Sequence, residues 1–373
     1  MSVFEFECAG CGAALTAPLS QVALPVHAHQ KYGNGAQLPV LMEPGTFAVD
    51  PEPWGPPRRM WEDVDPDEAA ARGIYAPVRA LSDGVTGAIA IAPGDSRGTL
   101  LIPEDGSAAC CGLGGGSGPN MLCEACDLPV ATRVDDCSLW QVVWLAPNAV
   151  RRRPVEGEGE GTDTGTGDAP HSWAELLAAD KRTPPLESIP RWGDRSGTYH
   201  FWSWSPRWEA AVGRALAHLL VASRGGPVTV PHGGLAEEVF QPALDALLPA
   251  GATPRRAVLA GPGLPVPAPH ADILLVPTHP QTAEFWTPGG DLATSAYSVP
   301  LPFGVWLWLA FPRPHLPIPA SGVMPPGTLR DDPPPPRARH RFWADERVFR
   351  DTLFRLPAVR DDPWLREITS RRW

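Results

Sequence analysis

The sequence predicts a two-domain fold of mixed α+β and α/β type, with a β-rich N-terminal domain followed by an α/β layered C-terminal domain. The chain has 373 residues, which is longer than a single hydrophobic core usually supports. Hydrophobic residues make up 43% of the chain, which is the ordinary share for a globular protein. Its first part has short apolar runs between Gly/Pro turns, whereas its later part alternates helical spacing with continuous apolar runs. A glycine-rich stretch with almost nothing to bury separates the two parts.

Residues 1–150 are the predicted β-rich domain. Their apolar runs are short and bounded by turn residues, which is typical of strands. The candidate strands are 87–93 (GAIAIAP), 98–103 (GTLLIP) and 138–146 (SLWQVVWLA).

Residues 151–172 are predicted to be a flexible, acidic, glycine-rich linker. The run RRRPVEGEGEGTDTGTGDAP alternates glycine with acidic residues or threonine and offers very little apolar surface to bury. We therefore expect it to join two separately folded halves.

Residues 173–311 are the predicted α/β domain. The predicted helices are 205–225 and 235–249, and the predicted strands are 227–231, 255–263 and 271–280. Only about ten residues, GPGLPVPAPH, separate the last two strands. This is too short for a helical crossover and favours an antiparallel pair.

Residues 312–373 are predicted to be a proline-rich extended segment followed by a C-terminal helix. Ten of the 25 residues in 312–336 are proline, which lacks an N–H group and favours an extended backbone. The helix is predicted over 346–356 (ERVFRDTLFRL).

The net charge of −11 is unevenly distributed along the chain. Residues 1–150 carry 7 basic and 18 acidic side chains, whereas residues 191–373 carry 19 basic and 16 acidic ones. Because nucleic-acid binding depends largely on cationic contacts with phosphates, the acidic first part is not expected to bind nucleic acid.

The sequence favours a cytoplasmic protein without membrane association. The N-terminus MSVFEFECAGCG has neither the basic start nor the apolar core of a signal peptide. The longest apolar run, PLPFGVWLWLAFP, has about 13 residues, whereas a membrane-spanning helix needs roughly 20. Cysteines in C-x-x-C pairs suit reduced thiols and metal binding better than a secreted disulfide framework.

Two C-x-x-C pairs share one pattern. In FECAGCGAALT and in MLCEACDLPVAT an apolar residue precedes the pair, a turn residue follows it, and a strand-like run comes next. Each such turn can direct two thiolates toward one ion, so two turns supply the closed tetrahedral four-sulfur shell of a structural Zn²⁺. Residues 1–150 are accordingly a predicted zinc-binding domain. The predicted ligands are Cys8, Cys11, Cys123 and Cys126.

These two segments resemble a split zinc ribbon, in which two cysteine knuckles on β-hairpins hold one structural zinc. The resemblance covers about 25 of the 373 residues and implies nothing about the remainder. The chain departs from the usual ribbon in having more than 100 residues between the knuckles and Asp127 in place of the second glycine.

Other arrangements of the cysteines remain open at this point. Cys110 and Cys111 are not expected to share an ion, because successive side chains diverge on an extended backbone. Without any metal, the cysteines would be buried apolar thiols. A local site would use Cys110, Cys123, Cys126 and Cys137, and would leave Cys8 and Cys11 to bind with His27 and His29 or not at all.

A weaker candidate site lies where PVTVP runs into HGG and then into a predicted helix. Free N–H groups and the helix dipole attract anions at such a junction, so His232, Gly233 and Gly234 are a candidate phosphate or carboxylate site. An ordinary helix start explains the same residues, and HGG lacks the fuller glycine pattern of a dinucleotide fold.

His279 comes just after a predicted strand, where open α/β sheets carry functional residues. An enzyme with a pocket near His232 and His279 is therefore one functional hypothesis. If the neighbouring strands are antiparallel, however, His279 lies at the opposite sheet edge from the GPG loop and is expected to be a solvated loop histidine.

The segment 191–208 is rich in tryptophan and arginine. Such residues can stack on the bases of single-stranded nucleic acid, which makes nucleic-acid binding a further hypothesis. The alternating aromatic residues also fit a strand that covers a core.

The favoured hypothesis is a zinc-stabilised intracellular protein that serves as an interaction or scaffold module for protein partners. A closed metal site, an acidic linker and an extended proline-rich segment support it. The sequence has no nucleophile elbow, no Walker loop and no H-E-x-x-H motif, so its catalytic residues are unknown and whether it is an enzyme stays open.

Overall fold

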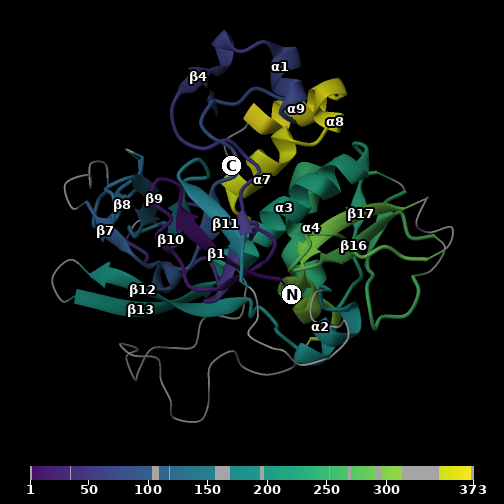
Figure 1. Cartoon of the computed structure of the whole chain (residues 1–373). Coiled ribbons are helices and arrows are strands. Elements are labelled where there is room, and N and C mark those ends of the chain that lie inside the picture. Colours follow the sequence, from purple (N-terminus) through teal and green to yellow (C-terminus); the bar gives the residue numbers. More distant parts are fainter. Residues whose placement is uncertain are drawn as a thin grey trace. The chain divides into compact units, whose positions relative to one another are not determined.

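The computed structural model describes residues 2–33, 35–102, 109–116, 118–155, 169–193, 197–251, 253–267, 270–289, 296–312 and 344–370 (Figure 1). It is a mixed α+β structure with a large curled β-sheet and several helices. The chain divides into two compact units. Unit 1 comprises Met1–Met60, Ala80–His171 and Arg191–Gly193, and unit 2 comprises Trp61–Arg79, Ser172–Pro190 and Asp194–Trp373.

Unit 1 is built on a nine-stranded sheet in the order β11-β1-β2-β3-β6-β10-β9-β8-β7. All neighbours are antiparallel except β2 and β3, which are parallel. β6, β7 and β10 lie within the three predicted strand segments. The strands are β1 (Val3–Cys8), β2 (Leu19–Gln21), β3 (Thr46–Val49), β6 (Ile89–Ile91), β7 (Thr99–Leu101), β8 (Met121–Cys123), β9 (Pro129–Val134), β10 (Val142–Leu145) and β11 (Val150–Pro154).

The central strands of this sheet are buried on both faces. Ile89 and Ile91 of β6 pack with Val143 of β10 in one apolar cluster, whereas Ala90 and Trp144 belong to a second cluster. Successive side chains of a strand point to opposite faces, so each strand supplies both clusters. This two-sided burial accounts for the continuous apolar runs of the sequence.

The sheet curls back on itself. β1 and β8 are six steps apart in the strand order, which in a flat sheet would separate them by roughly 29 Å at about 4.8 Å per step. Yet Sγ of Cys8, at the end of β1, lies 3.5 Å from Sγ of Cys126, just after β8. The curl therefore brings the two predicted knuckles together.

The basic run that opens the predicted linker forms the edge strand β11. Arg153 pairs with Glu7 of β1 at 2.7 Å, and the guanidinium of Arg152 lies over an aromatic ring of the same neighbouring strand. Any linker thus begins after Pro154. The middle of the predicted linker, residues 156–168, lies outside the described residues.

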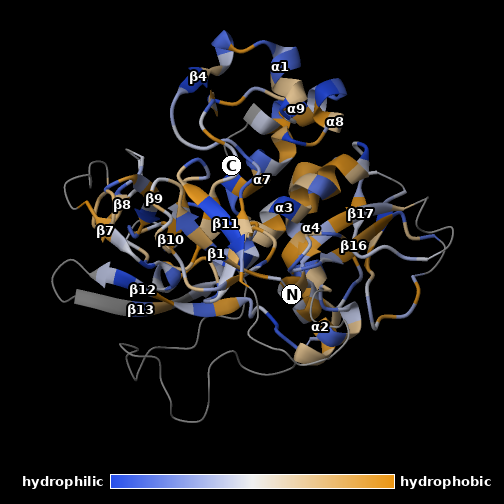
Figure 2. Ribbon diagram, in the orientation of Figure 1, coloured by the Kyte–Doolittle hydropathy of each residue, from blue (hydrophilic) through white to orange (hydrophobic). Residues whose placement is uncertain are grey.

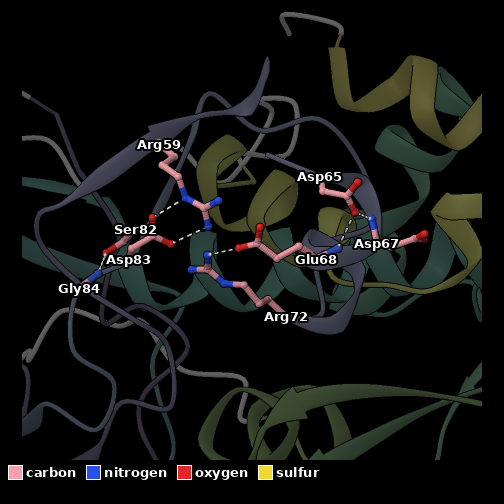
Figure 3. Close-up of polar contacts among 8 residues, drawn as sticks. All are labelled: Arg59, Asp65, Asp67, Glu68, Arg72, Ser82, Asp83 and Gly84. Carbon is pink, nitrogen blue, oxygen red and sulfur yellow. Dashed lines mark hydrogen bonds and ion pairs between the residues drawn. The ribbon is translucent and has the colours of Figure 1, made fainter. Parts of the chain in front are cut away.

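Unit 1 also contains a two-stranded ribbon of β4 (Arg58–Met60) and β5 (Ala80–Ser82). Arg59 of β4 donates to both carboxylate oxygens of Asp83, at 2.6 and 3.0 Å (Figure 3). This bidentate pair fixes the ribbon where β5 ends.

The segment 61–79 belongs to unit 2, although the sequence placed it in the N-terminal domain. It contains helix α1 (Pro66–Ala71), which Asp65 caps by accepting two backbone N–H bonds of the first turn (Figure 3). The backbone N–H of Tyr75 then donates to the carbonyl of Phe354. This bond joins the segment to a C-terminal helix that is distant in sequence.

Unit 2 contains a four-stranded sheet in the order β14-β15-β16-β17, and every neighbouring pair is parallel. Helix α3 is largely apolar (Figure 2) and packs against β17 and α7. The strands are β14 (Val228–Thr229), β15 (Arg255–Leu259), β16 (Ile273–Thr278) and β17 (Tyr297–Pro302), and the helices are α2 (Trp173–Ala179), α3 (Pro206–Ser223), α4 (Leu235–Leu247), α6 (Phe303–Ala310), α7 (Glu346–Phe354), α8 (Ala358–Asp361) and α9 (Pro363–Ser370).

The predicted antiparallel pairing of the strands at 255–263 and 271–280 is wrong, because β15 and β16 are parallel. Residues 260–272 connect them. The return path along a five-residue strand is about 17 Å, and thirteen extended residues can span roughly 40 Å. An extended connection is therefore long enough without a helix, which the prediction had taken to be necessary.

The last predicted segment is described only in part. The proline-rich stretch lies mostly within 313–343, outside the described residues, whereas α7 falls within the predicted C-terminal helix. The longest apolar run forms the end of β17 and the eight-residue helix α6. Among the described residues, no helix has the length and apolarity needed to span a membrane.

Candidate metal centre

The first knuckle begins at Cys8, the last residue of β1. The N–H of Cys8 donates to the carbonyl of Ala13 at 2.8 Å, and the N–H of Gly12 donates to the carbonyl of Cys8 at 2.9 Å. The N–H groups of Gly10 and Cys11 donate to the sulfur of Cys8. The turn therefore presents two thiols and directs backbone dipoles at one of them.

The second knuckle repeats these bonds after β8. The N–H of Cys123 donates to the carbonyl of Leu128 at 2.8 Å, and the N–H of Asp127 donates to the carbonyl of Cys123 at 2.9 Å. Ala125 and Leu128 donate their N–H groups to the sulfurs of Cys123 and Cys126. The similarity of the two sequence motifs is thus a similarity of backbone structure.

Asp127 occupies the position that Gly12 holds in the first knuckle. Both residues adopt the left-handed backbone conformation, with φ of +79° for Gly12 and +57° for Asp127. Glycine adopts this conformation freely, and aspartate is among the residues that tolerate it best. The departure from the usual ribbon pattern therefore leaves the turn intact.

The four sulfur atoms of the two knuckles lie within 4.8 Å of one another. Cys8 and Cys126 are 3.5 Å apart, and Cys11 and Cys123 are 3.6 Å apart. Four thiolates placed tetrahedrally at about 2.3 Å from a zinc ion have sulfurs roughly 3.8 Å apart. The spacing is close to that of an assembled four-thiolate shell.

The pKa values of these thiols depend on burial, on backbone N–H donors and on the neighbouring thiols. Burial opposes ionisation of Cys8, but N–H donors of its own turn and thiols of the second knuckle outweigh it and lower the pKa of Cys8 to about 7. The N–H of Leu128 favours a thiolate at Cys126, yet thiols of the first knuckle raise the pKa of Cys126 to about 12. Burial raises the pKa of Cys123. Cys8 therefore ionises readily, whereas Cys123 and Cys126 need a nearby cation to favour the thiolate form.

The surroundings fit a structural metal. The side chains of Cys8 and Cys123 are fully buried in the apolar cluster of unit 1, whereas Cys11 and Cys126 are exposed. Four protein sulfurs fill a tetrahedral shell and leave no position for a reacting water. The cluster can hold a metal ion between the two ends of the curled sheet.

The other three cysteines form a second group with Asp136, separate from the first. The local site that combines Cys110 with cysteines of the second knuckle is therefore not what the structure assembles. Cys110 and Cys111 lie in the same group because the chain bends there, whereas the prediction that they diverge assumed an extended backbone. Nothing in the sequence pattern marked Asp136 as a member.

His27 and His29 join neither cysteine group among the described residues. His27 is buried against Trp140, with 4.3 Å between ring centroids. His29 bonds to the buried carboxylate of Asp50 at 2.7 Å. Both histidines belong to the packing around the second apolar cluster of unit 1.

The candidate anion site at His232, Gly233 and Gly234 already faces a carboxylate. Gly234 precedes α4, and Glu237 in its first turn accepts from the N–H of Gly233 at 2.6 Å and contacts His232 Nδ1 at 2.5 Å. These contacts lower the pKa of Glu237, the bond with His232 contributing most. An external anion would have to displace Glu237, so the residues serve the helix start.

The expectation of a solvated His279 is wrong, because this residue is buried. Its Nδ1 accepts from the N–H groups of Gln281 and Thr282 at 3.2 and 3.3 Å, and its ring meets Trp173 edge to face. His279 therefore stabilises the turn after β16. His232 follows β14, and β15 lies between these strands, so the two histidines do not share one strand junction.

The tryptophan-rich stretch forms β12 (Leu186–Gly193), β13 (Gly197–Trp204) and the start of α3. Trp208 is buried and donates to a backbone carbonyl at 2.7 Å, as expected for a core residue. Trp192 is 49% exposed. Stacking on bases stays a hypothesis for this exposed residue.

Unit 2 contains a histidine with a lowered pKa that no sequence motif marks. His218 of α3 lies one turn after Arg214, and its Nδ1 is 3.3 Å from the hydroxyl of Tyr297. Burial, and then the charge of Arg214, lower the pKa of His218 to about 4. The residue is thus neutral at neutral pH in the folded protein.

Acidification is expected to destabilise unit 2 through His218. The unfolded histidine titrates near 6.5, above the folded value of about 4, so between these values the unfolded chain binds a proton that the folded chain does not. Stability is therefore full above pH 6.5 and falls as pH drops toward 4, by roughly 2 to 3 kcal/mol. His218→Gln should lose less stability over this range in denaturant unfolding. An equal loss in both proteins would contradict the assignment.

Comparisons of the chain with protein-family models, with curated proteins and with solved structures give no match.

Proposed function

We propose that the protein is stabilised by one structural zinc ion, held by Cys8, Cys11, Cys123 and Cys126, and acts as an interaction module for protein partners. The observation that carries the metal assignment is the repeated knuckle, with the same closing bonds on both sides of a four-sulfur cluster. Zinc suits this donor set, because thiolate ligands and tetrahedral geometry are typical of its structural sites.

The zinc joins two ends of the sheet. The remaining surface of unit 1 can then bind a partner. Sheet edge β7 is next to β8, which carries the second knuckle. Leu100 and Leu101 of β7 are 49% and 42% exposed, and the strand Thr99–Leu101 carries no charge. Natural proteins usually protect an exposed edge strand with charge or proline. An uncharged, apolar edge supports the addition of an extended strand from a partner protein.

A single charged substitution tests the proposed edge. Leu101→Lys should reduce the recovery of specific partners from cell extract at least tenfold, because a buried lysine opposes strand addition. Val266→Lys is the matched control, since Val266 is an exposed apolar residue of unit 2. Partners lost with the first variant and retained with the second support the proposal. Equal recovery with both variants contradicts it, and a concentration-dependent dimer in sedimentation would identify a second copy as the occupant.

The positions of His232 and His279 give little support to the enzyme hypothesis. His232 pairs with Glu237, and His279 is engaged in its own turn. A nucleic-acid role would depend on the exposed Trp192. Salt-sensitive binding of single-stranded oligonucleotides that is lost in Trp192→Ala would favour that role over protein binding.

A further inference from the structure

The three cysteines outside the knuckles converge with a carboxylate just after the end of β9. Cys110 and Cys111 lie in the glycine-rich segment 109–116, and Asp136 and Cys137 follow β9. Their four ligand atoms lie within 4.8 Å of one another. With this group, all seven cysteines of the chain fall into two clusters.

The backbone holds the two segments together independently of the cysteine side chains. Leu113 and Asp135 exchange two backbone hydrogen bonds, at 2.9 and 2.8 Å. Gly112 makes this approach feasible, because a Cβ atom there would overlap the carbonyl oxygen of Asp135. The cluster is therefore presented by a fixed bridge between neighbouring segments.

Backbone donors are aimed at the side chains of this cluster. The N–H groups of Cys110 and Cys111 donate to the carboxylate of Asp136, at 3.2 and 2.9 Å. The N–H of Cys137 donates to the sulfur of Cys111 at 3.2 Å, and that of Gly35 donates to the sulfur of Cys137. Donors of this kind favour the deprotonated groups that a metal ion needs.

The donor set is three sulfurs and one carboxylate oxygen. Asp136 Oδ1 is 3.0 Å from the sulfur of Cys111 and 3.8 Å from that of Cys110, and the sulfurs of Cys110 and Cys137 are 2.8 Å apart. Thiols that here donate to a carboxylate can exchange their protons for one divalent ion. Thiolate and carboxylate are both common ligands of zinc, and the sulfurs of Cys110 and Cys137 would move about 1 Å apart to reach the roughly 3.8 Å of a tetrahedral shell.

We propose that Cys110, Cys111, Asp136 and Cys137 form a second zinc site, which exchanges its metal more readily than the four-cysteine site. Both sites have two exposed cysteines, but in the second site Asp136 is half-buried and Cys137 is its one buried member, whereas Cys8 and Cys123 of the four-cysteine site are both fully buried in the core. A chelator therefore reaches the second site directly. Its ion ties a surface loop to a turn rather than joining the two ends of the sheet.

Metal content and release kinetics test the second site. Protein purified without oxygen and loaded with zinc should carry two ions per chain, with one released to a chromogenic chelator at least tenfold faster than the other. Cys111→Ser and Asp136→Asn, which change exposed or half-buried residues, should each lose the fast phase and keep the slow one. Cys8→Ser should keep the fast phase, which separates this proposal from the structural zinc.

Two glycine variants test the geometry without changing a ligand. Gly112→Ala should abolish the fast phase, because its methyl group pushes Asp135 away, whereas Gly116→Ala should retain it because that position opens to free space. One ion per chain in the wild type, or an unchanged fast phase in Cys111→Ser, overturns the proposal. A protein that remains two mass units lighter after anaerobic reduction and zinc loading also overturns it, since Cys110 and Cys137 would then form a disulfide.

Discussion

Cys123→Ser is expected to remove the zinc of the four-cysteine site and to lower the free energy of unfolding of unit 1 by at least about 3 kcal/mol. Structural zinc contributes roughly 10 kcal/mol or more to the folding of small zinc domains, although part of that is offset here by an existing core. Cys123 is fully buried, so the variant also places a hydroxyl within the apolar cluster. Both effects act in the same direction.

The effect should extend over the whole sheet of unit 1. The sulfurs of Cys8 and Cys126 join residues 118 positions apart, and thus close a very long loop. Closure entropy grows only slowly with loop length, so a metal that closes this loop stabilises all strands within it. Hydrogen exchange should accelerate in Cys123→Ser across β2, β3, β6, β7 and β8, which lie within the loop, and across the unit 1 strands that pair with them. Peptides of unit 2 after residue 172, which lie outside the loop, should keep their protection.

Ala125→Ser is the control for this experiment. Ala125 is exposed in the same knuckle and contributes its backbone N–H rather than its side chain. It should retain the zinc and the wild-type unfolding curve. If Cys123→Ser keeps its slowly released zinc in full, the ion is not held by the two knuckles, and the structural role assigned to them fails.

Local pattern was enough to place many elements and both knuckles. The strands within 87–93 and 138–146 were recognisable because buried apolar runs between turns are a local signal. The pairing of Cys8 with Cys126 is not local, but two copies of one turn in a single chain suggested it. Repetition therefore carried long-range information that a single C-x-x-C pair does not contain.

The features that the sequence did not predict depend on contacts between residues that are far apart in the chain. Cys110 and Cys111 share a cluster only because Gly112 lets the chain bend against the carbonyl of Asp135. No local spacing brings Asp136 into that cluster. Likewise, β15 and β16 pair in parallel because the short segment between them, when extended, is long enough to return to the start of the sheet without a helix.

Gly261→Ala is expected to destabilise unit 2 by about 3 kcal/mol or more, at the upper end of the usual cost of overpacking. Gly261 follows β15 and faces the indole of Trp306 in α6. A Cβ atom there would overlap the six-membered ring, at 2.7 Å from Cε2 and 2.9 Å from Cη2. The indole cannot withdraw, because Trp306 is fully buried and its Nε1–H donates to the carbonyl of Ala260 at 3.1 Å.

The clash can be separated from other costs by a double-mutant cycle. Trp306→Phe removes the ring atoms that the new methyl group would strike, at the cost of a cavity and of the bond to Ala260. If overlap is the cause, Gly261→Ala should cost at least about 1 kcal/mol less in the Trp306→Phe background than in the wild type. Gly289→Ala, at a position open to free space, should change the free energy of unfolding by less than about 0.5 kcal/mol. Equal costs in both backgrounds would mean that the backbone at residue 261, rather than the indole, requires glycine.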